Sequence, residues 1–189
     1  MKYLKPLIIV LAIIILIFVL VRTSGKYILP ALYGPSQTEN TGTASVDEKL
    51  LNKKAPFFDL PTPLDARVKL SQFLDAPVIL VFWSTWNQDS LNQVKIVDDY
   101  LSAQTDRKLV SFLAINSQEE PSIVKSYVRR GGYTVPFALD SYGDISENYH
   151  VKSLPVLYFI DREGIIREIY SGVLSQSMIV SKIEQLLKG

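Results

Sequence analysis

A continuous apolar run at residues 77–82 is the feature that most constrains the fold of this chain. It lacks the polar–apolar alternation of a strand with one exposed face and is typical of a strand buried on both faces. The run leads into Trp83 and Trp86, and residues 89–103 then place apolar side chains at helical spacing. The sequence therefore predicts a central strand that turns into a helix within a Trp-x-x-Trp segment. We expect Trp83 in the core and Trp86 half-exposed.

Strand and helix patterns alternate along residues 53–189, which predicts an α/β or α+β arrangement of layers. The glycines at 131–132 end one helix, and a turn at residues 161–164 joins two strands as a hairpin. We expect Ile123 and Leu187 on the buried faces of their helices. The expected strands are 57–60, 68–70, 78–83, 109–116, 137–139, 155–160 and 165–170, and the expected helices are 89–103, 121–130, 145–149 and one that begins near 175.

The amino-terminal part of the chain has the pattern of a membrane segment. Residues 7–21 carry no polar side chain. This length is short for a bilayer core of ~30 Å at a rise of ~1.5 Å per residue, but it suffices when residues 3–5 are included with the lysine snorkelling. A cleaved signal peptide is the alternative, although no Ala-x-Ala-like cleavage site follows the run. We interpret residues 1–22 as a retained signal-anchor transmembrane helix.

Charged residues around this segment predict its orientation. Two lysines and the amino terminus precede it, and Arg22 and Lys26 follow it, which favours a cytoplasmic amino terminus. The protein would then be a single-pass protein of the cell membrane. Residues 23–52 are polar and lack a hydrophobic period, so we interpret them as a flexible tether. Residues 53–189 would form an extracytoplasmic domain.

Composition excludes several classes of function. The chain has 20 basic and 19 acidic residues, so its charge gives no reason to expect a nucleic-acid partner. It contains no cysteine, which excludes disulfides and thiolate chemistry within this polypeptide. With one histidine in the chain, a multi-histidine metal centre is also excluded. We expect neither a metal nor another cofactor.

Three motifs together resemble a known family. They are Ala-Pro-Phe-Phe-Asp-Leu-Pro at residues 55–61, Val-Phe-Trp-Ser-Thr-Trp at 81–86, and Ser-Leu-Pro-Val-Leu-Tyr-Phe-Ile-Asp-Arg-Glu-Gly at 153–164. In this order and spacing they resemble the membrane-anchored redoxins of the thioredoxin-like superfamily, the TlpA-like and AhpC/TSA-related proteins. The resemblance implies an α/β thioredoxin-like fold, with a central mixed sheet flanked by helices and an N-terminal transmembrane helix.

The chain departs from this family at the residues that carry the chemistry. Where the family has Cys-x-x-Cys, this chain has Asn-Gln-Asp-Ser, so Asn87 and Ser90 stand at the cysteine positions. Gln93 stands where many such proteins have a buried glutamate. A hydroxyl and an amide cannot replace a thiolate in disulfide exchange, because exchange needs a thiolate to attack sulfur. We therefore expect no catalytic residue at Asn87, Ser90 or Gln93.

The resemblance also implies a binding site. In redoxins the loop before a cis proline pairs with an extended substrate segment by strand addition. In this chain Leu154 and Pro155 match that loop, and Trp86 would be its apolar neighbour. The resemblance implies a cis peptide bond between Leu154 and Pro155.

These residues lead to two functional hypotheses. The first is a membrane-tethered, redox-inactive module that binds an extracytoplasmic protein or peptide without catalysis. The alternative is a thiol-disulfide oxidoreductase or redoxin in an extracytoplasmic redox or antioxidant pathway, which requires the cysteines of a partner. A structural domain that binds nothing also fits, with Asn87 or Asp89 serving as a helix cap. A hydrolase built on Ser90 and His150 would lack an evident oxyanion site.

Overall fold

The computed structural model describes residues 48–104 and 109–188, which belong to one compact unit. The predicted anchor at residues 1–22 lies outside the described residues, as does most of the predicted tether. A short 3-10 helix, η1 (Glu48–Leu50), begins the described part. Within these two ranges no helix is long and apolar enough to cross a bilayer.

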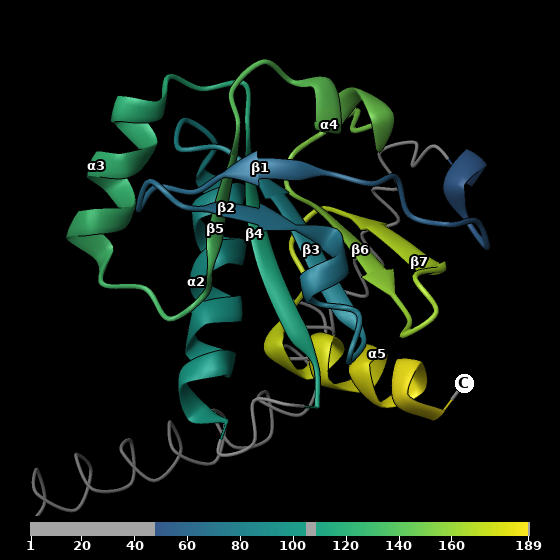
Figure 1. Ribbon diagram of the computed structural model, residues 1–189. Helices are drawn as coiled ribbons and strands as arrows, with labels where there is room; N and C mark the ends of the chain where they lie inside the picture. Colours follow the sequence, from purple (N-terminus) through teal and green to yellow (C-terminus); the bar gives the residue numbers. More distant parts are fainter. Residues whose placement is uncertain (1–47, 105–108, 189) are drawn as a thin grey trace, which may run out of the picture. The chain divides into compact units, whose positions relative to one another are not determined.

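The centre of the fold is a five-stranded mixed sheet with the order β5-β4-β3-β6-β7 (Figure 1). Strand β3 pairs in parallel with β4 and antiparallel with β6, while β4–β5 is parallel and β6–β7 is antiparallel. Every residue of β3 is buried, as the apolar run predicts. The strands are β3 (Val78–Trp83), β4 (Ser111–Ser117), β5 (Phe137–Asp140), β6 (Val156–Ile160) and β7 (Ile166–Ser171).

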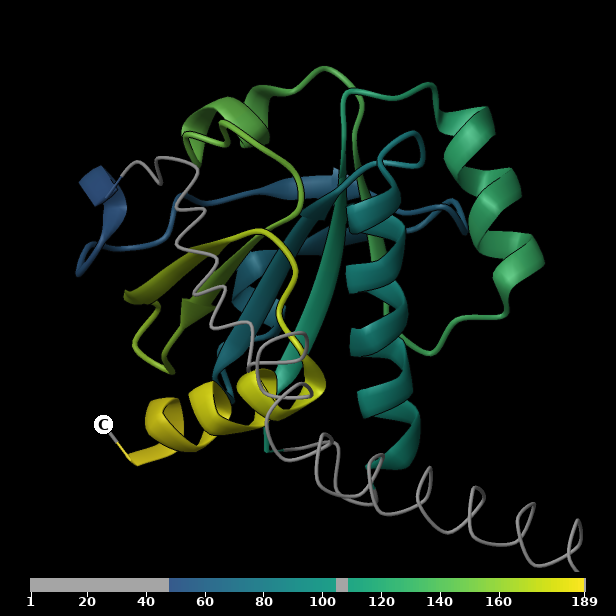
Figure 2. The ribbon, with the colours of Figure 1, turned by 180° about the vertical axis from the view of Figure 1, so that it is seen from behind.

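One face of the sheet is covered by helices. Figure 2 shows α2 and α5 lying across this face, with α3 beside the sheet. The core under them joins Val81 and Trp83 of β3 to Val94, Val97 and Ile179 of the helices. Full burial of an aliphatic side chain of this size contributes about 1.5–3 kcal/mol, so this face is a main source of stability. The helices are α2 (Gln88–Ala103), α3 (Pro121–Gly131) and α5 (Gln176–Lys188).

The opposite face is covered by a second layer. An antiparallel hairpin of β1 and β2 lies in front of the sheet in Figure 1, and α4 lies near its upper edge. Leu80 and Phe82 of β3 pack here against Phe58, Leu60 and Tyr149. Because both faces of β3 are covered, its sequence needs apolar residues at every position. The elements of this layer are β1 (Asp59–Pro61), β2 (Arg67–Lys69), the 3-10 helix η2 (Leu70–Gln72) and α4 (Asp144–Asn148).

The expected mixed sheet flanked by helices is confirmed, but two details of the helix faces are wrong. Ile123 is 52% exposed and Leu187 is 39% exposed, although both were expected to be buried. Each lies next to a better buried position, and neighbours in a helix are rotated by about 100°. In α3 the position that reaches the core is Val124, which is fully buried. The spacing of apolar residues predicted these helices correctly, but it predicted a wider buried face on each helix than the structure shows.

Candidate functional site

The site begins where β3 ends and its chain turns into α2. The backbone N–H of Thr85 donates to Glu119 Oε2 at 2.6 Å, and the Thr85 hydroxyl donates to the other carboxylate oxygen. Asn116 Nδ2, at the end of β4, donates to Glu119 Oε2 at 2.6 Å. One carboxylate therefore ties the loop after β3 to the end of the neighbouring strand and fixes the backbone that carries Trp86.

Sequence reasoning missed Glu119. The signal that points to it is its place just after a strand parallel to β3, since the carboxyl ends of parallel neighbours meet at one edge of the sheet.

Asn87 joins the start of α2 to the loop before β6. It is the N-cap of the helix, and its Oδ1 accepts the N–H of Ser90 at 2.9 Å. Its Nδ2 donates to the carbonyl oxygen of Leu154 at 3.3 Å. The capping interpretation is confirmed for Asn87. The structure also brings Asn87, at a position where the family has cysteine, into contact with Leu154 of the expected binding loop.

The peptide bond between Leu154 and Pro155 is cis, as expected. Pro155 is buried and Leu154 is partly buried, directly before β6. The loop is held from the other side by a contact between the Ser153 and Ser171 hydroxyls at 2.6 Å. The carbonyl of Leu154 is thus presented beside the helix start by contacts on both sides of the loop.

A cavity of about 880 Å³ lies beside the cis-proline loop and is lined mainly by that loop and by α4, with Trp86 contributing from the segment before α2. Trp86 lines this cavity and is 71% exposed, more than the half exposure expected. Tyr142 is 91% exposed and also lines the cavity. Gln118 and His150 line it with left-handed backbones, at φ 56° and 54°, which residues with a side chain seldom adopt. Leu154, Glu147 and Lys152 also line it.

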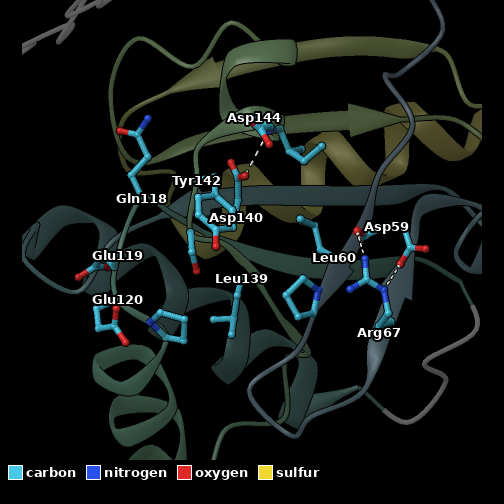
Figure 3. A pocket seen from close by; sticks show the side chains of 14 residues that line it. Asp59, Leu60, Arg67, Gln118, Glu119, Glu120, Leu139, Asp140, Tyr142 and Asp144 are labelled. Carbon is cyan, nitrogen blue, oxygen red and sulfur yellow. Dashed lines mark hydrogen bonds and ion pairs between the residues drawn. The ribbon is translucent and has the colours of Figure 1, made fainter.

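A second cavity, of about 730 Å³, shares Gln118 and Tyr142 with the first and is rich in carboxylates (Figure 3). The Arg67 guanidinium contacts the Asp59 carboxylate at 2.8 Å, and this hydrogen bond is the main reason that the pKa of Asp59 is lowered. Asp140 is buried and accepts the backbone N–H groups of Ile145 and Ser146 at the start of α4. The Asp59 carboxylate thus joins β1 to β2, and the Asp140 carboxylate holds the start of α4.

Ser90 and Gln93 both lie on the buried side of α2. Gln93 Oε1 accepts the backbone N–H of Leu174 at 2.6 Å, which ties α2 to the segment before α5. Gln93 Nε2 and Ser90 Oγ are buried and have no hydrogen-bond partner. Because no base contacts the Ser90 hydroxyl, the geometry gives no support to the hydrolase hypothesis. Among residues 48–104 and 109–188, no cluster of three histidine or carboxylate side chains could hold a metal ion.

Comparison with known proteins identifies the family. Residues 51–169, more than half of the chain, match the AhpC/TSA family. The chain belongs to the AhpC/TSA family. The chain is similar to the thiol-disulfide oxidoreductase ResA of Bacillus cereus, to which it is 30% identical over 130 residues, covering 68% of this chain and 75% of ResA. ResA of Bacillus subtilis is 25% identical over 165 residues, covering 87% of this chain and 86% of that protein.

Solved structures agree on the fold of this AhpC/TSA-family chain. A thiol:disulfide interchange protein of the thioredoxin family from Chlorobium tepidum superposes with a TM-score of 0.63, covering 71% of this chain and 95% of the other. The sequence identity is 17%, so this likeness bears on fold alone. The expected α/β thioredoxin-like fold is confirmed.

The relatives overturn the first functional hypothesis. The absence of cysteine led us to expect a redox-inactive binding module, but the two ResA relatives of this AhpC/TSA-family chain are named thiol-disulfide oxidoreductases. Without cysteine this polypeptide cannot itself form or attack a disulfide. Disulfide exchange needs sulfur atoms at the site, but these atoms can come from the other proteins that meet there. The alternative hypothesis therefore agrees better with the relatives.

Proposed function

We propose that this protein works in thiol-disulfide exchange outside the cytoplasm, and that the cysteines of its partners supply the sulfur atoms. The observation that carries the proposal is the contact between Asn87 and Leu154. It places the start of a 16-residue helix beside the cis-proline loop, at a cavity lined by Trp86 and Leu154. The chain with this geometry is 30% identical to a thiol-disulfide oxidoreductase.

Substrate binding in this proposal uses the backbone of the cis-proline loop. An extended client segment pairs with Leu154 as an added strand, and the exposed ring of Trp86 packs on its apolar side chains. The Leu154 carbonyl has two lone pairs, and the Asn87 amide uses one of them. The second lone pair is left for a client N–H group. The Asn87 contact also fixes the direction in which the carbonyl points.

Exchange at this position needs no bond to the protein. A partner thiolate R1–S⁻ attacks the client disulfide R2–S–S–R3, the R1–S–S–R2 bond forms, and R3–S⁻ leaves. One disulfide bond breaks for each one that forms, so the step needs no external oxidant or reductant. Negative charge lies on the attacking and leaving sulfurs throughout. The positive end of the α2 dipole stabilises such charge by about 0.3–1 kcal/mol, which favours the charged sulfur species at the site over those in free solution by roughly two- to fivefold.

Location follows from the amino-terminal segment. The apolar run at residues 7–21 is the proposed anchor, and residues 23–52 are the proposed tether to the domain. A tether of this kind raises the local concentration of the domain near partners in the same membrane. The proposed partners are therefore the membrane itself and extracytoplasmic proteins or peptides with cysteines.

A peptide assay tests the proposal. The full chain in detergent micelles is mixed with reduced glutathione and a short extended peptide that carries its cysteine as a mixed disulfide with thionitrobenzoate. The release of thionitrobenzoate is followed by absorbance. We expect the protein to accelerate release and the rate to saturate with peptide concentration.

Two variants locate the effect. Trp86→Ala should raise the peptide concentration needed to saturate the release rate, because it removes an exposed ring that lines the cavity. Ile123→Ala is the matched control, since it removes an exposed apolar side chain on α3, away from the residues that line the cavity. Equal release rates with and without the protein, at every peptide concentration, would refute the proposal.

A further inference from the structure

Two tyrosines at the end of α3 form an unusual pair. The rings of Tyr127 and Tyr133 are stacked, with centroids 5.5 Å apart and planes inclined by 24°. The hydroxyl of Tyr133 donates a hydrogen bond to the hydroxyl of Tyr127. Both side chains are partly exposed. The two phenol groups are therefore in contact at a position that small oxidants in solvent can reach.

The chain between them is built to allow this contact. Gly132 ends α3 with a left-handed backbone at φ 61°, which turns the chain back along the helix. A Cβ atom on Gly131 would lie only 2.0 Å from Cε2 of Tyr133. Glycine at position 131 is thus needed for the Tyr133 ring to fold over the helix end onto Tyr127.

We propose that Tyr127 and Tyr133 are a modification site, at which a one-electron oxidant couples the two rings into an intramolecular dityrosine. Each tyrosine gives one electron to the oxidant and loses its phenolic proton. The unpaired electron of a tyrosyl radical is shared between the oxygen and the ring carbons next to it. A carbon–carbon bond then forms between the two Cε atoms, and each ring regains aromaticity when its Cε hydrogen moves to oxygen. The balance is two electrons and two protons released for one bond formed.

Contact between the two hydroxyls favours coupling of the Tyr127 and Tyr133 rings. Because the two oxygens meet, the Cε carbons beside them lie in the closest halves of the stacked rings. Burial and the Tyr133 hydrogen bond raise the pKa of Tyr127, so this hydroxyl stays protonated at neutral pH and its oxidation must release the proton.

A second close tyrosine pair has the wrong geometry. The rings of Tyr149 and Tyr158 have centroids 5.1 Å apart, but their planes cross at 84°. The Tyr149 hydroxyl donates to the Pro56 carbonyl, and the Tyr158 hydroxyl donates to the backbone carbonyl of Tyr149. Both side chains are at most 2% exposed. Oxidants reach these rings poorly, and the two hydroxyls are bonded to different backbone groups.

Mass spectrometry tests the site directly. The full chain in micelles, at low concentration, is treated with a haem peroxidase and hydrogen peroxide, and the monomer is isolated. Trypsin cuts after Arg129 and Arg130, so the two tyrosines fall in different peptides. We expect these peptides to be joined, with the loss of two hydrogen atoms, and fragmentation to map the bond to Tyr127 and Tyr133.

Variants distinguish coupling between Tyr127 and Tyr133 from oxidation elsewhere in the protein. Tyr127→Phe and Tyr133→Phe should each abolish the intramolecular bond, and Gly131→Ala should reduce it although both phenols remain. Tyr142→Phe is the matched control: it removes the 91% exposed phenol and should leave the bond unchanged. Circular dichroism checks that each variant is folded. A bond that persists in Tyr127→Phe, or an oxidised monomer without any joined peptides, would overturn the proposal.

Discussion

Gln93→Glu is the substitution that tests most directly how the site is built. The side chain of Gln93 is fully buried, its Oε1 accepts the Leu174 N–H at 2.6 Å, and its Nε2 has no partner. Glutamate has the same shape and keeps the oxygen that accepts this hydrogen bond. It replaces the amide nitrogen by a second oxygen that must either carry a proton or share a negative charge.

Burial without a second donor favours the protonated acid. We expect the pKa of Glu at position 93 to rise by about three units above its ordinary value of ~4.3, because desolvation penalises the charged form. The single N–H of Leu174 opposes this rise but does not cancel it. Each unit is worth ~1.36 kcal/mol, so the free energy of unfolding should fall by about 4 kcal/mol above the folded-state pKa.

The sign of the pH dependence follows from proton binding. Above pH ~4.3 the unfolded state loses the proton while the folded state keeps it, so stability declines as the pH rises toward the folded-state pKa. Urea unfolding at pH 4 and at pH 8 measures this change. At pH 4 the variant should be close to the wild type, and at pH 8 it should be strongly destabilised.

Two controls accompany this measurement. Asn92→Asp adds a carboxylate to an exposed position next to Gln93, and it should show little added pH dependence. Gln93→Leu leaves the Leu174 N–H without its acceptor and should cost about 1–3 kcal/mol at both pH values. If Gln93→Glu lost the same stability at pH 4 as at pH 8, burial beside a single N–H donor would not raise the pKa of the glutamate, and the prediction would be refuted.

Other substitutions test the start of α2. Asn87→Ala should cost about 1 kcal/mol of unfolding free energy in urea titrations, because it removes the cap on the Ser90 N–H, whereas Asn87→Asp keeps the cap and should cost less. Asp89→Asn removes an exposed negative charge from the first turn and should raise the thionitrobenzoate release rate by about twofold at low salt; an unchanged rate would argue against the helix dipole. Asn87→Cys with Ser90→Cys should form an intramolecular disulfide on oxidation, detected by thiol titration, and persistent free thiols would show that the two positions do not match the family's cysteines.

Local sequence patterns predicted the secondary structure because they reflect local constraints. The apolar run of β3, the helical spacing of α2 and the glycines that end α3 each follow from which side chains must be buried or which backbone angles are needed. The edges of these elements were less well predicted. The strand expected from residue 109 begins at Ser111, and Leu109 is 50% exposed.

The sequence pointed to candidate site residues only where a family motif covered them. Asn87, Leu154 and Pro155 were singled out because their motifs resemble those of redoxins, and the structure places Asn87 and Leu154 in contact. Glu119 belongs to no such motif, and its role depends on the meeting of two strand ends. The exposure of Trp86 depends on which segments fail to cover it, and no local pattern encodes that.

Composition alone shows that this polypeptide has no thiol chemistry of its own, because cysteine content is independent of folding. Local patterns predicted the order of strands and helices along the chain, and three motifs predicted the fold. Tertiary structure alone decided which distant groups meet: Asn87 reaches Leu154 across 67 residues, and Gln93 reaches Leu174 across 81. Hydrogen bonds act over about 3 Å, so they depend on how the chain packs in space, and separation along the sequence carries no information about them.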